Sequence, residues 1–419
     1  MSNSNNNLIS KSKLLSYGVF GFSISIVLLC CVSIIFPALI SSTNSEFSEL
    51  PFYTTQVDPF EIGTLAIPFV TINVIVLLVG IIYHKKKYSI NKIFNFDVSK
   101  KITFIIISII LSSYIFATIS EFEKEENFAD WYEMEIRLNE SIRDNRFTFE
   151  DAISGNPNYS GIEPHVKYSL LLISEKLFGD FRVIAFIASI ALLITTFYIS
   201  KEITKKRIPG IIALILVLQS NTFLTYDTSA TYSNFWILFY LLSLYLVLKK
   251  WQLSHISFVL SIFSKLFSIV FLPLTIFFTL NNTKGKKRIY LSIFYIILLG
   301  IGLLVASNSD ILFNTESTYL PENFLKGFEQ FSYQLRFDPI VLIFLLPLTI
   351  LLFLKSLKGF HQANSILVLI SGFLLIPPLL ITFSEQTNEP YRLIPLIVFF
   401  AIGASTLLGK IRSVEPLSK

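Results

Sequence analysis

Apolar runs of about 18 to 25 residues recur from residue 14 to residue 409, and this repetition limits what the chain can fold into. A helix of that length crosses a hydrocarbon layer of about 30 Å, and it satisfies its own backbone hydrogen bonds there. Only 15% of the 419 residues are charged, against about a quarter in average soluble domains. The sequence therefore predicts an all-α polytopic membrane protein.

The apolar runs predict about 12 transmembrane segments. We expect single spans at 14–40, 64–84, 101–119, 181–200, 208–224, 233–249, 288–306, 338–355, 363–384 and 391–409, and an unusual stretch at 253–281. The division follows: residues 1–100 hold an N-terminal tail and two extra helices, residues 101–409 a membrane core, and residues 410–419 a short tail.

The charge of the loops predicts the orientation of the spans. The loops at 85–101, 201–207, 249–250 and 284–288 are basic, whereas those at 41–63, 120–180 and 307–337 are acidic on balance. Lys and Arg are enriched in cytoplasmic loops. We therefore expect both termini and the basic loops in the cytoplasm, and the loop at 120–180 on the outer side.

The stretch 253–281 conflicts with that orientation if it crosses the membrane once, because the basic 284–288 loop would then lie outside. Two crossings remove the conflict, but each half has only about 13 residues, too few to span unaided. A hairpin whose tip carries Lys265 at membrane depth, beside a watery cavity, fits both facts. The alternative is one kinked helix with a lysine that reaches the interface.

A dense group of carboxylates follows the span at 101–119. Six of them lie between residues 121 and 133: Glu121, Glu123, Glu125, Glu126, Asp130 and Glu133. Apolar residues recur at steps of three and four from residue 128 to residue 142, which predicts an amphipathic interfacial helix with an acidic face. They are Phe128, Trp131, Met134, Leu138 and Ile142. Most of these acids fit a solvated face, but Asp130 lies beside Trp131 at the border of the two faces, where partial burial would make the carboxylate more basic.

The segment 161–180 predicts a second helix start. Pro164 favours the first turn of a helix, and that turn would bring Glu163 and His165 near free backbone N–H groups. A binding role for these two side chains and a simple capped helix with an incidental histidine both fit this pattern.

Several chemistries lack their motifs. The sequence has no GxxxxGK[ST], HExxH, GxGxxG or GxSxG pattern, its four histidines are scattered, and its two cysteines are adjacent within the first apolar run. Nucleotide cradles, zinc sites and disulfides are therefore not indicated. The net charge of +5 follows from the basic cytoplasmic loops, so we expect no nucleic-acid partner.

Four stretches in order give the chain a resemblance to a known group. They read ADWY at Asp130, EPHVKYSLLL at Pro164, FSK at Lys265 and YRLIP at Tyr391 and Arg392. Over residues 101–409 this order resembles the membrane-embedded glycosyltransferases of the GT-C superfamily, such as the protein O-mannosyltransferases and the lipid A aminoarabinose transferases. Trp131 stands where that group usually has a second acidic residue.

The resemblance implies a function. It implies inverting transfer of a sugar from a polyprenyl-phosphate donor to a lipid or protein acceptor at the outer face of the plasma membrane, as in glycosylation of the cell envelope. Asp130 would be the catalytic base, with Glu121, Glu123 and Glu126 as alternatives. Substrate binding would fall to Glu163, His165, Lys265, Tyr391 and Arg392.

Two other functions remain open on the sequence. The chain could be a flippase for lipid-linked sugars or another transporter, or a non-catalytic assembly protein of the envelope. The clustering of charge in the outer loop and at one hairpin tip favours the enzyme, because a transporter places charge inside its spans. No metal site or certain cofactor is predicted, although the carboxylates could hold a divalent cation.

Overall fold

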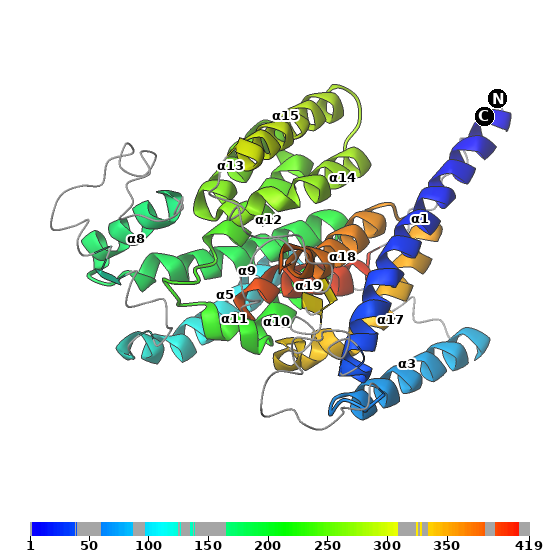
Figure 1. The fold of residues 1–419 in the computed structure, drawn as a ribbon, viewed down its shortest axis with the longest axis horizontal. Helices are drawn as coiled ribbons and strands as arrows, with labels where there is room; N and C mark the ends of the chain where they lie inside the picture. Colours follow the sequence, from blue (N-terminus) through cyan, green and yellow to red (C-terminus); the bar gives the residue numbers. More distant parts are fainter. Residues whose placement is uncertain are drawn as a thin grey trace. The chain divides into compact units, whose positions relative to one another are not determined.

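The computed structural model describes residues 2–37, 39, 60–86, 97–124, 126, 135–136, 138, 165–308, 324–325, 327–328, 334–381 and 390–409. Side chains are not described for residues 2–12, 83–86, 123, 165, 303–308 and 380–381. Throughout these ranges every element is a helix (Figure 1). The chain forms two compact units, Met1–Phe96 with Asn308–Lys419 (unit 1) and Asp97–Ser307 (unit 2).

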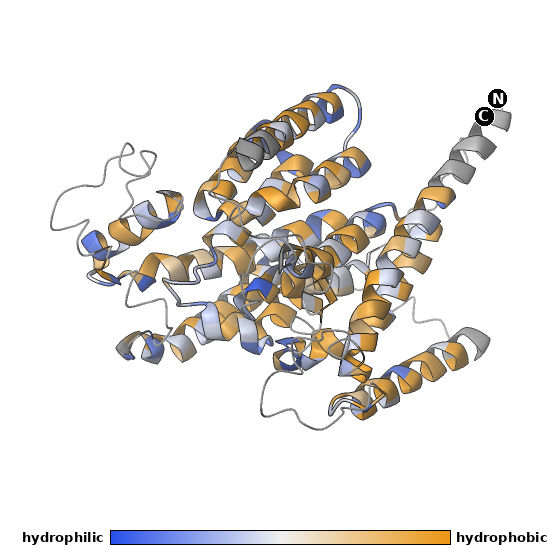
Figure 2. Ribbon diagram, in the orientation of Figure 1, coloured by the Kyte–Doolittle hydropathy of each residue, from blue (hydrophilic) through white to orange (hydrophobic). Residues whose placement is uncertain are grey.

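Five helices are long and apolar enough to cross a membrane. They are Lys13–Ile35, Lys100–Phe122, Arg182–Thr204, Pro339–Leu357 and Gln362–Leu379. Shorter apolar helices lie at Ala66–Ile82, Arg207–Leu218, Phe235–Lys249, Leu266–Asn282 and Pro390–Thr406. Figure 2 shows hydrophobic residues along the bodies of the helices and hydrophilic ones mainly at their ends. The chain is therefore a helical membrane protein by composition and helix length, while the number of about 12 crossings stays a prediction.

Unit 1 is built around packed long helices. It contains α1 (Ser2–Ile35), α3 (Ala66–Lys86), η5 (Leu335–Phe337), α17 (Pro339–Leu357), α18 (Gln362–Ile381), η6 (Pro390–Leu393) and α19 (Ile394–Thr406). Helix α1 packs on α17 and α18, and α18 packs on α19. Phe20 stacks on Phe353 at 4.0 Å, and Asn364 Nδ2 donates to Ser16 Oγ at 3.0 Å. The N-terminal helix is thus part of this core.

Unit 2 carries the rest of the helices. They are α5 (Lys100–Thr118), η2 (Ile119–Glu123), α8 (His165–Phe178), α9 (Arg182–Thr204), α10 (Arg207–Leu218), α11 (Asn221–Tyr226), α12 (Phe235–Lys249), η3 (Trp251–Leu253), α13 (Ser254–Ser264), η4 (Leu266–Phe271), α14 (Leu272–Asn282) and α15 (Lys286–Asn308). Helix α9 packs on α8, α10 and α12. The predicted core of residues 101–409 is therefore shared between the two units.

Local chemistry fixes the ends of several helices in unit 2. The Ser99 hydroxyl accepts the N–H of Ile102 at the start of α5. Asp97 Oδ1 accepts the N–H groups of Arg207 and Ile208 at 2.9 and 3.1 Å, so a distant carboxylate caps α10. Lys205 ends α9 with φ of 59°, the left-handed conformation that commonly stops a helix.

The stretch 253–281 breaks at Lys265, as the hairpin prediction requires. Helix α13 ends at Ser264, and Lys265 has extended backbone angles (φ −162°, ψ 116°) before η4 and α14. Helices α13 and α14 have 11 residues each, roughly 17 Å of helix. Neither is long enough to cross a membrane alone.

Contacts with α12 show that the chain also reverses direction at this break. Along α13, Ser254 and Ser261 contact Ser243 and Trp236, so α13 runs antiparallel to α12. After the break, the Phe271 ring lies 5.9 Å from the Trp236 ring, and Thr275 Oγ1 donates to Tyr240 Oη. Helix α14 therefore runs back alongside α12, which confirms the predicted reversal of the chain over a single kinked helix, while the two membrane crossings stay a prediction.

Three serines hold the first arm of the hairpin against α12. The hydroxyls of Ser254, Ser257 and Ser261 donate to the carbonyls of Ser243, Phe239 and Trp236 at 3.0, 2.8 and 2.7 Å. Small side chains let the two backbones approach closely, and neutral hydrogen bonds join them. We call these three residues the serine ladder.

Candidate functional site

A buried carboxylate lies beside the end of helix α5. Asp227 follows α11, and its side chain is only 1% exposed. The hydroxyl of Tyr114, on α5, donates to Asp227 Oδ2 at 2.5 Å. Asp227 Oδ1 is buried and has no hydrogen-bond partner among the described residues. Burial of a carboxylate oxygen without a hydrogen bond lowers the stability of the fold, so its presence calls for an explanation.

The surroundings of Asp227 favour its neutral form. Burial raises the pKa of Asp227 to about 7, and the negative charge of Glu121 pushes it in the same direction. The hydrogen bond from Tyr114 opposes both effects, because it stabilises the ionised form. Asp227 can therefore take up or release a proton near neutral pH.

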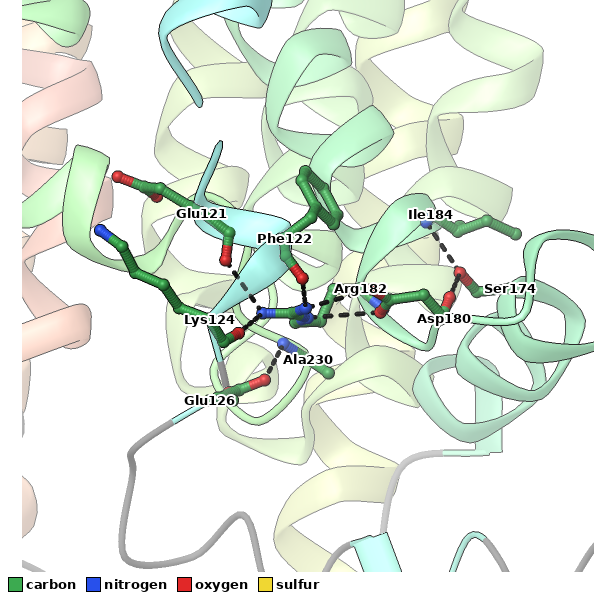
Figure 3. A network of polar contacts seen from close by, with 9 residues as sticks. All are labelled: Glu121, Phe122, Lys124, Glu126, Ser174, Asp180, Arg182, Ile184 and Ala230. Carbon is green, nitrogen blue, oxygen red and sulfur yellow. Dashed lines mark hydrogen bonds and ion pairs between the residues drawn. The ribbon is translucent and has the colours of Figure 1, made fainter. Parts of the chain in front are cut away.

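Arg182 organises the short helix η2, which continues α5. Its guanidinium donates to the carbonyl oxygens of Glu121, Phe122 and Lys124 at 3.3, 2.5 and 2.7 Å (Figure 3). On its other side it forms an ion pair with Asp180 at 3.1 Å. The Glu121 carboxylate points away from the guanidinium in Figure 3, so Arg182 binds the main chain there and leaves the acidic side chain available.

Glu126 anchors the next part of the acidic stretch. Its Oε1 accepts the hydroxyl of Ser229 and the N–H of Thr231 at 2.6 and 3.0 Å, and its Oε2 accepts the N–H of Ala230 at 2.9 Å (Figure 3). Both carboxylate oxygens are thus engaged with the connection between α11 and α12. This geometry suits an anchor better than a catalytic base, which needs a free oxygen.

The connection between α11 and α12 is itself held by α8 and α9. Ser189 Oγ donates to the carbonyl of Asp227 at 2.7 Å and accepts from Asn234 Nδ2 at 2.9 Å. Lys167 Nζ, from the first turn of α8, donates to the carbonyl of Thr231 at 2.7 Å. Asp227 is therefore carried on a fixed segment.

An apolar cluster packs next to this polar region. Its buried members are Leu138, Leu171, Phe181, Ala185, Ala188, Ala230 and Phe235. Leu138 belongs to the predicted apolar stripe of the acidic helix; it is fully buried, while Ile136 is 40% exposed. Glu135, Ile136 and Leu138 are helical. At this point the stripe faces protein, whereas we expected it to face the membrane interface.

Asp130, the predicted catalytic residue, lies outside the described residues. Trp131, Glu163 and the side chain of Glu123 lie outside them as well. Helix α8 begins at His165, which confirms the predicted helix start at the EPHVKY stretch, but the His165 side chain is not described. Of the alternative bases, Glu126 uses both carboxylate oxygens in hydrogen bonds to residues 229–231. The negative charge of Glu121 raises the pKa of Asp227.

The predicted phosphate-binding residues belong to different units. Lys265 is half-buried at the hairpin tip of unit 2. Tyr391 and Arg392 lie in η6 of unit 1 and are 5% and 8% exposed, and Arg392 Nε donates to Tyr391 Oη at 3.4 Å. Their joint action on one substrate stays a prediction.

A metal centre finds no support in the part of the chain that is described. Across those ranges no three His, Cys, Asp or Glu side chains come close enough to hold an ion. Much of the carboxylate group that could bind a divalent cation, including Asp130, lies outside them. Cys30 and Cys31 are buried in α1 and form no disulfide.

Asp227, Tyr114 and Arg182 were not predicted as site residues. Asp227 did carry a signal, because it is the only Asp or Glu between Glu202 and Asp310. A lone acid in such an apolar region is expensive and is commonly functional. Arg182 carried a weaker signal, since a cation in the first turn of a helix opposes the helix dipole.

Comparisons with known proteins add no relative. No protein-family model matches the chain, no curated protein matches it, and no solved structure matches it. The function must therefore be argued from the residues and their geometry.

Proposed function

We propose that the chain is a membrane-embedded glycosyltransferase that moves a sugar from a polyprenyl-phosphate donor to a lipid or protein acceptor, with inversion. The observation that carries the proposal is Asp227, buried beside the acidic stretch with one free carboxylate oxygen. Its place at the end of an apolar helix is where a lipid-linked substrate and a water-soluble acceptor would meet.

The reaction assigns a task to each charged residue. The acceptor oxygen attacks the anomeric carbon, its proton passes to a carboxylate, and the bond to the lipid phosphate breaks. Asp130 is the proposed base, as the resemblance implies. Asp227 Oδ1 would accept a hydrogen bond from a substrate hydroxyl, and its partnership with Tyr114 leaves that oxygen free for the purpose.

The leaving group requires positive charge and no proton. A phosphate in a low-dielectric site is stabilised by charge-assisted hydrogen bonds. Lys265 and Arg392 are the proposed donors of those bonds, with Tyr391, Glu163 and His165 lining the substrate site. The break of the hairpin supports this role, because it puts Lys265 between two helices that are each too short to cross a membrane, where a charged side chain requires polar surroundings.

The loop charges support a reaction at the outer face of the plasma membrane, with both termini in the cytoplasm. A cysteine placed at Lys286, in a chain without Cys30 and Cys31, should react with impermeant reagents only from the cytoplasmic side. Reaction from the outside would contradict this sidedness.

A second function is favoured by one observation. A buried carboxylate whose pKa burial raises to about 7, as in Asp227, is also typical of proton-coupled transporters. In that case the lipid-linked sugar, or another substrate, would cross the membrane unchanged while Asp227 gained and lost a proton.

One experiment separates the two functions. The purified chain, reconstituted in vesicles, is incubated with a panel of polyprenyl-phosphate sugars, and release of polyprenyl phosphate is measured together with movement of intact donor between leaflets. The proposal expects release that depends on an acceptor. Movement of intact donor without release would favour the transporter, and neither activity would favour an assembly protein.

A further inference from the structure

Arg182 occupies a position that is unfavourable for a helix by itself. It is the first residue of the 23-residue helix α9, and a cation there opposes the helix dipole. Asp180 offsets part of this effect, because its Oδ1 accepts the N–H of Arg182 at 2.7 Å and its Oδ2 pairs with the guanidinium. A local rule broken in this way commonly marks a functional requirement.

What Arg182 gains is a hold on the end of η2. The last carbonyl groups of a helix lack helical partners, and the planar fork of one guanidinium reaches those of Phe122 and Lys124 as well as that of Glu121, which also accepts the N–H of Lys124 at 3.2 Å (Figure 3). The guanidinium also lies 5.4 Å from the centre of the Phe122 ring. An ammonium group has no such fork.

Glu126 holds the same segment from its other end. Its carboxylate takes three hydrogen bonds from residues 229–231, in the connection that also carries Asp227. Tyr114 on α5 connects this segment back to α5, since its hydroxyl donates to Asp227. These contacts join α5, η2, Glu126 and residues 227–231, and Glu121 lies on η2 among them.

We infer that Arg182 and Glu126 are positioning residues of the proposed site, which hold residues 121–124 and Glu126 against residues 227–231 so that Glu121 and Asp227 stay together. Neither residue takes part in the chemistry, because the guanidinium and both carboxylate oxygens are committed to these structural bonds. The effect of these two residues on the reaction rate rests on the proposed function. Their effect on the placement of Glu121 beside Asp227, the geometric core of the inference, does not.

The geometric core is tested through the titration of Asp227. The groups that act on the pKa of this carboxyl are the hydroxyl of Tyr114 on α5, the charge of Glu121 on η2 and the backbone N–H groups of Thr228 and of Asp227 itself. Infrared difference spectra, assigned with Asp227→Asn, follow its protonation in the reconstituted full chain at a series of pH values. In Glu126→Gln and Arg182→Lys the segment should move away, and the midpoint of the Asp227 titration should fall because Glu121 is more distant and water enters.

The matched controls make the same substitutions at exposed positions elsewhere in the chain. Glu61 and Arg288 are exposed, so Glu61→Gln and Arg288→Lys should leave the Asp227 titration at its wild-type midpoint. If Arg182→Lys does not fold, Ser229→Ala removes a single donor from Glu126 and should shift the midpoint in the same direction. An unchanged midpoint in Glu126→Gln and in either of the other two variants would overturn the inference.

The catalytic consequence is measured separately. Misplacement of a site by about 1 Å can lower a rate roughly 100-fold, so both variants should lose kcat with little change in KM. A shifted Asp227 midpoint in a chain without transferase activity would support the positioning role and overturn the proposed function. An unshifted midpoint in an active enzyme would do the reverse.

Discussion

The end of α5 and the serine ladder are both polar regions of an apolar chain, but they are built differently. In the ladder, three neutral hydroxyls each donate to one carbonyl of α12. At the end of α5, the charged side chains of Arg182 and Glu126 lie close to residues 227–231, and Asp227 Oδ1 stays without a hydrogen-bond partner within the described residues. Every hydroxyl of the ladder has a hydrogen-bond partner, whereas the end of α5 contains one carboxylate oxygen without one in the part of the chain that is described.

The difference separates packing from function. Neutral hydrogen bonds between helices contribute on the order of 1 kcal/mol each and need no other purpose. Buried charges are far more expensive, and an unpartnered carboxylate oxygen loses the hydration it had in water without replacement. We therefore assign the ladder to stability and the end of α5 to the activity of the protein.

The largest effect is expected from the residue assigned as base. A general base commonly contributes about 100- to 10,000-fold in rate, so Asp130→Asn should lower transfer by that factor and leave donor binding near the wild-type level. Release of polyprenyl phosphate and donor affinity are measured on the same preparation. Full activity in Asp130→Asn, with loss in Glu121→Gln, would move the assignment upstream to the described end of α5.

An intermediate effect is expected from the proposed phosphate ligands. A hydrogen bond to a charged group is worth roughly 1.5–3 kcal/mol, so Lys265→Met and Arg392→Met should each raise the donor Kd about 10- to 150-fold. The donor Kd is measured by equilibrium binding of a fluorescent polyprenyl-phosphate sugar. Wild-type affinity in both variants would remove Lys265 and Arg392 from the site.

The smallest effect is a pair of opposite shifts in the titration of Asp227. Tyr114→Phe removes a bond to the ionised carboxylate and should raise the pKa of Asp227, whereas Glu121→Gln removes a negative charge and should lower it. Because the folded pKa of about 7 exceeds the ordinary aspartate pKa of 3.8, the native state retains a proton between these two pH values. Stability should therefore fall as pH rises from about 4 to about 7 and level off above that.

Infrared titration and thermal unfolding at several pH values check these shifts. Serine-ladder variants serve as controls, since their hydroxyls carry no charge and should leave the Asp227 midpoint in place. Shifts of the same sign in Tyr114→Phe and Glu121→Gln would contradict the electrostatic account.

The sequence predicted the helical class and the break at Lys265, because both follow from apolar length and loop charge. It also predicted that the EPHVKY stretch begins a helix, which α8 confirms at His165. These features depend on short-range patterns. The direction of the apolar stripe at Leu138 was less predictable, since a hydrophobic face suits lipid and protein equally.

The composition of the site at α5 could not be predicted in full. Tyr114 and Asp227 are 113 residues apart in sequence, and Arg182 reaches back 58 to 61 residues to its carbonyl partners. Periodicity says nothing about such pairs. The isolation of Asp227 in an apolar region was visible, but only its burial and its free oxygen distinguish it from a loop acid.

The most direct test compares Asp227→Asn with Ser261→Ala in the same vesicles. Transfer to an acceptor and thermal unfolding are measured for both variants. We predict that Asp227→Asn lowers kcat/KM by at least about 10-fold, the value of one hydrogen bond to a charged group, and that it unfolds no earlier than wild type above pH 7. Ser261→Ala should transfer sugar normally and lose about 1 kcal/mol of stability. Wild-type transfer by Asp227→Asn would contradict the assignment of function to the end of α5.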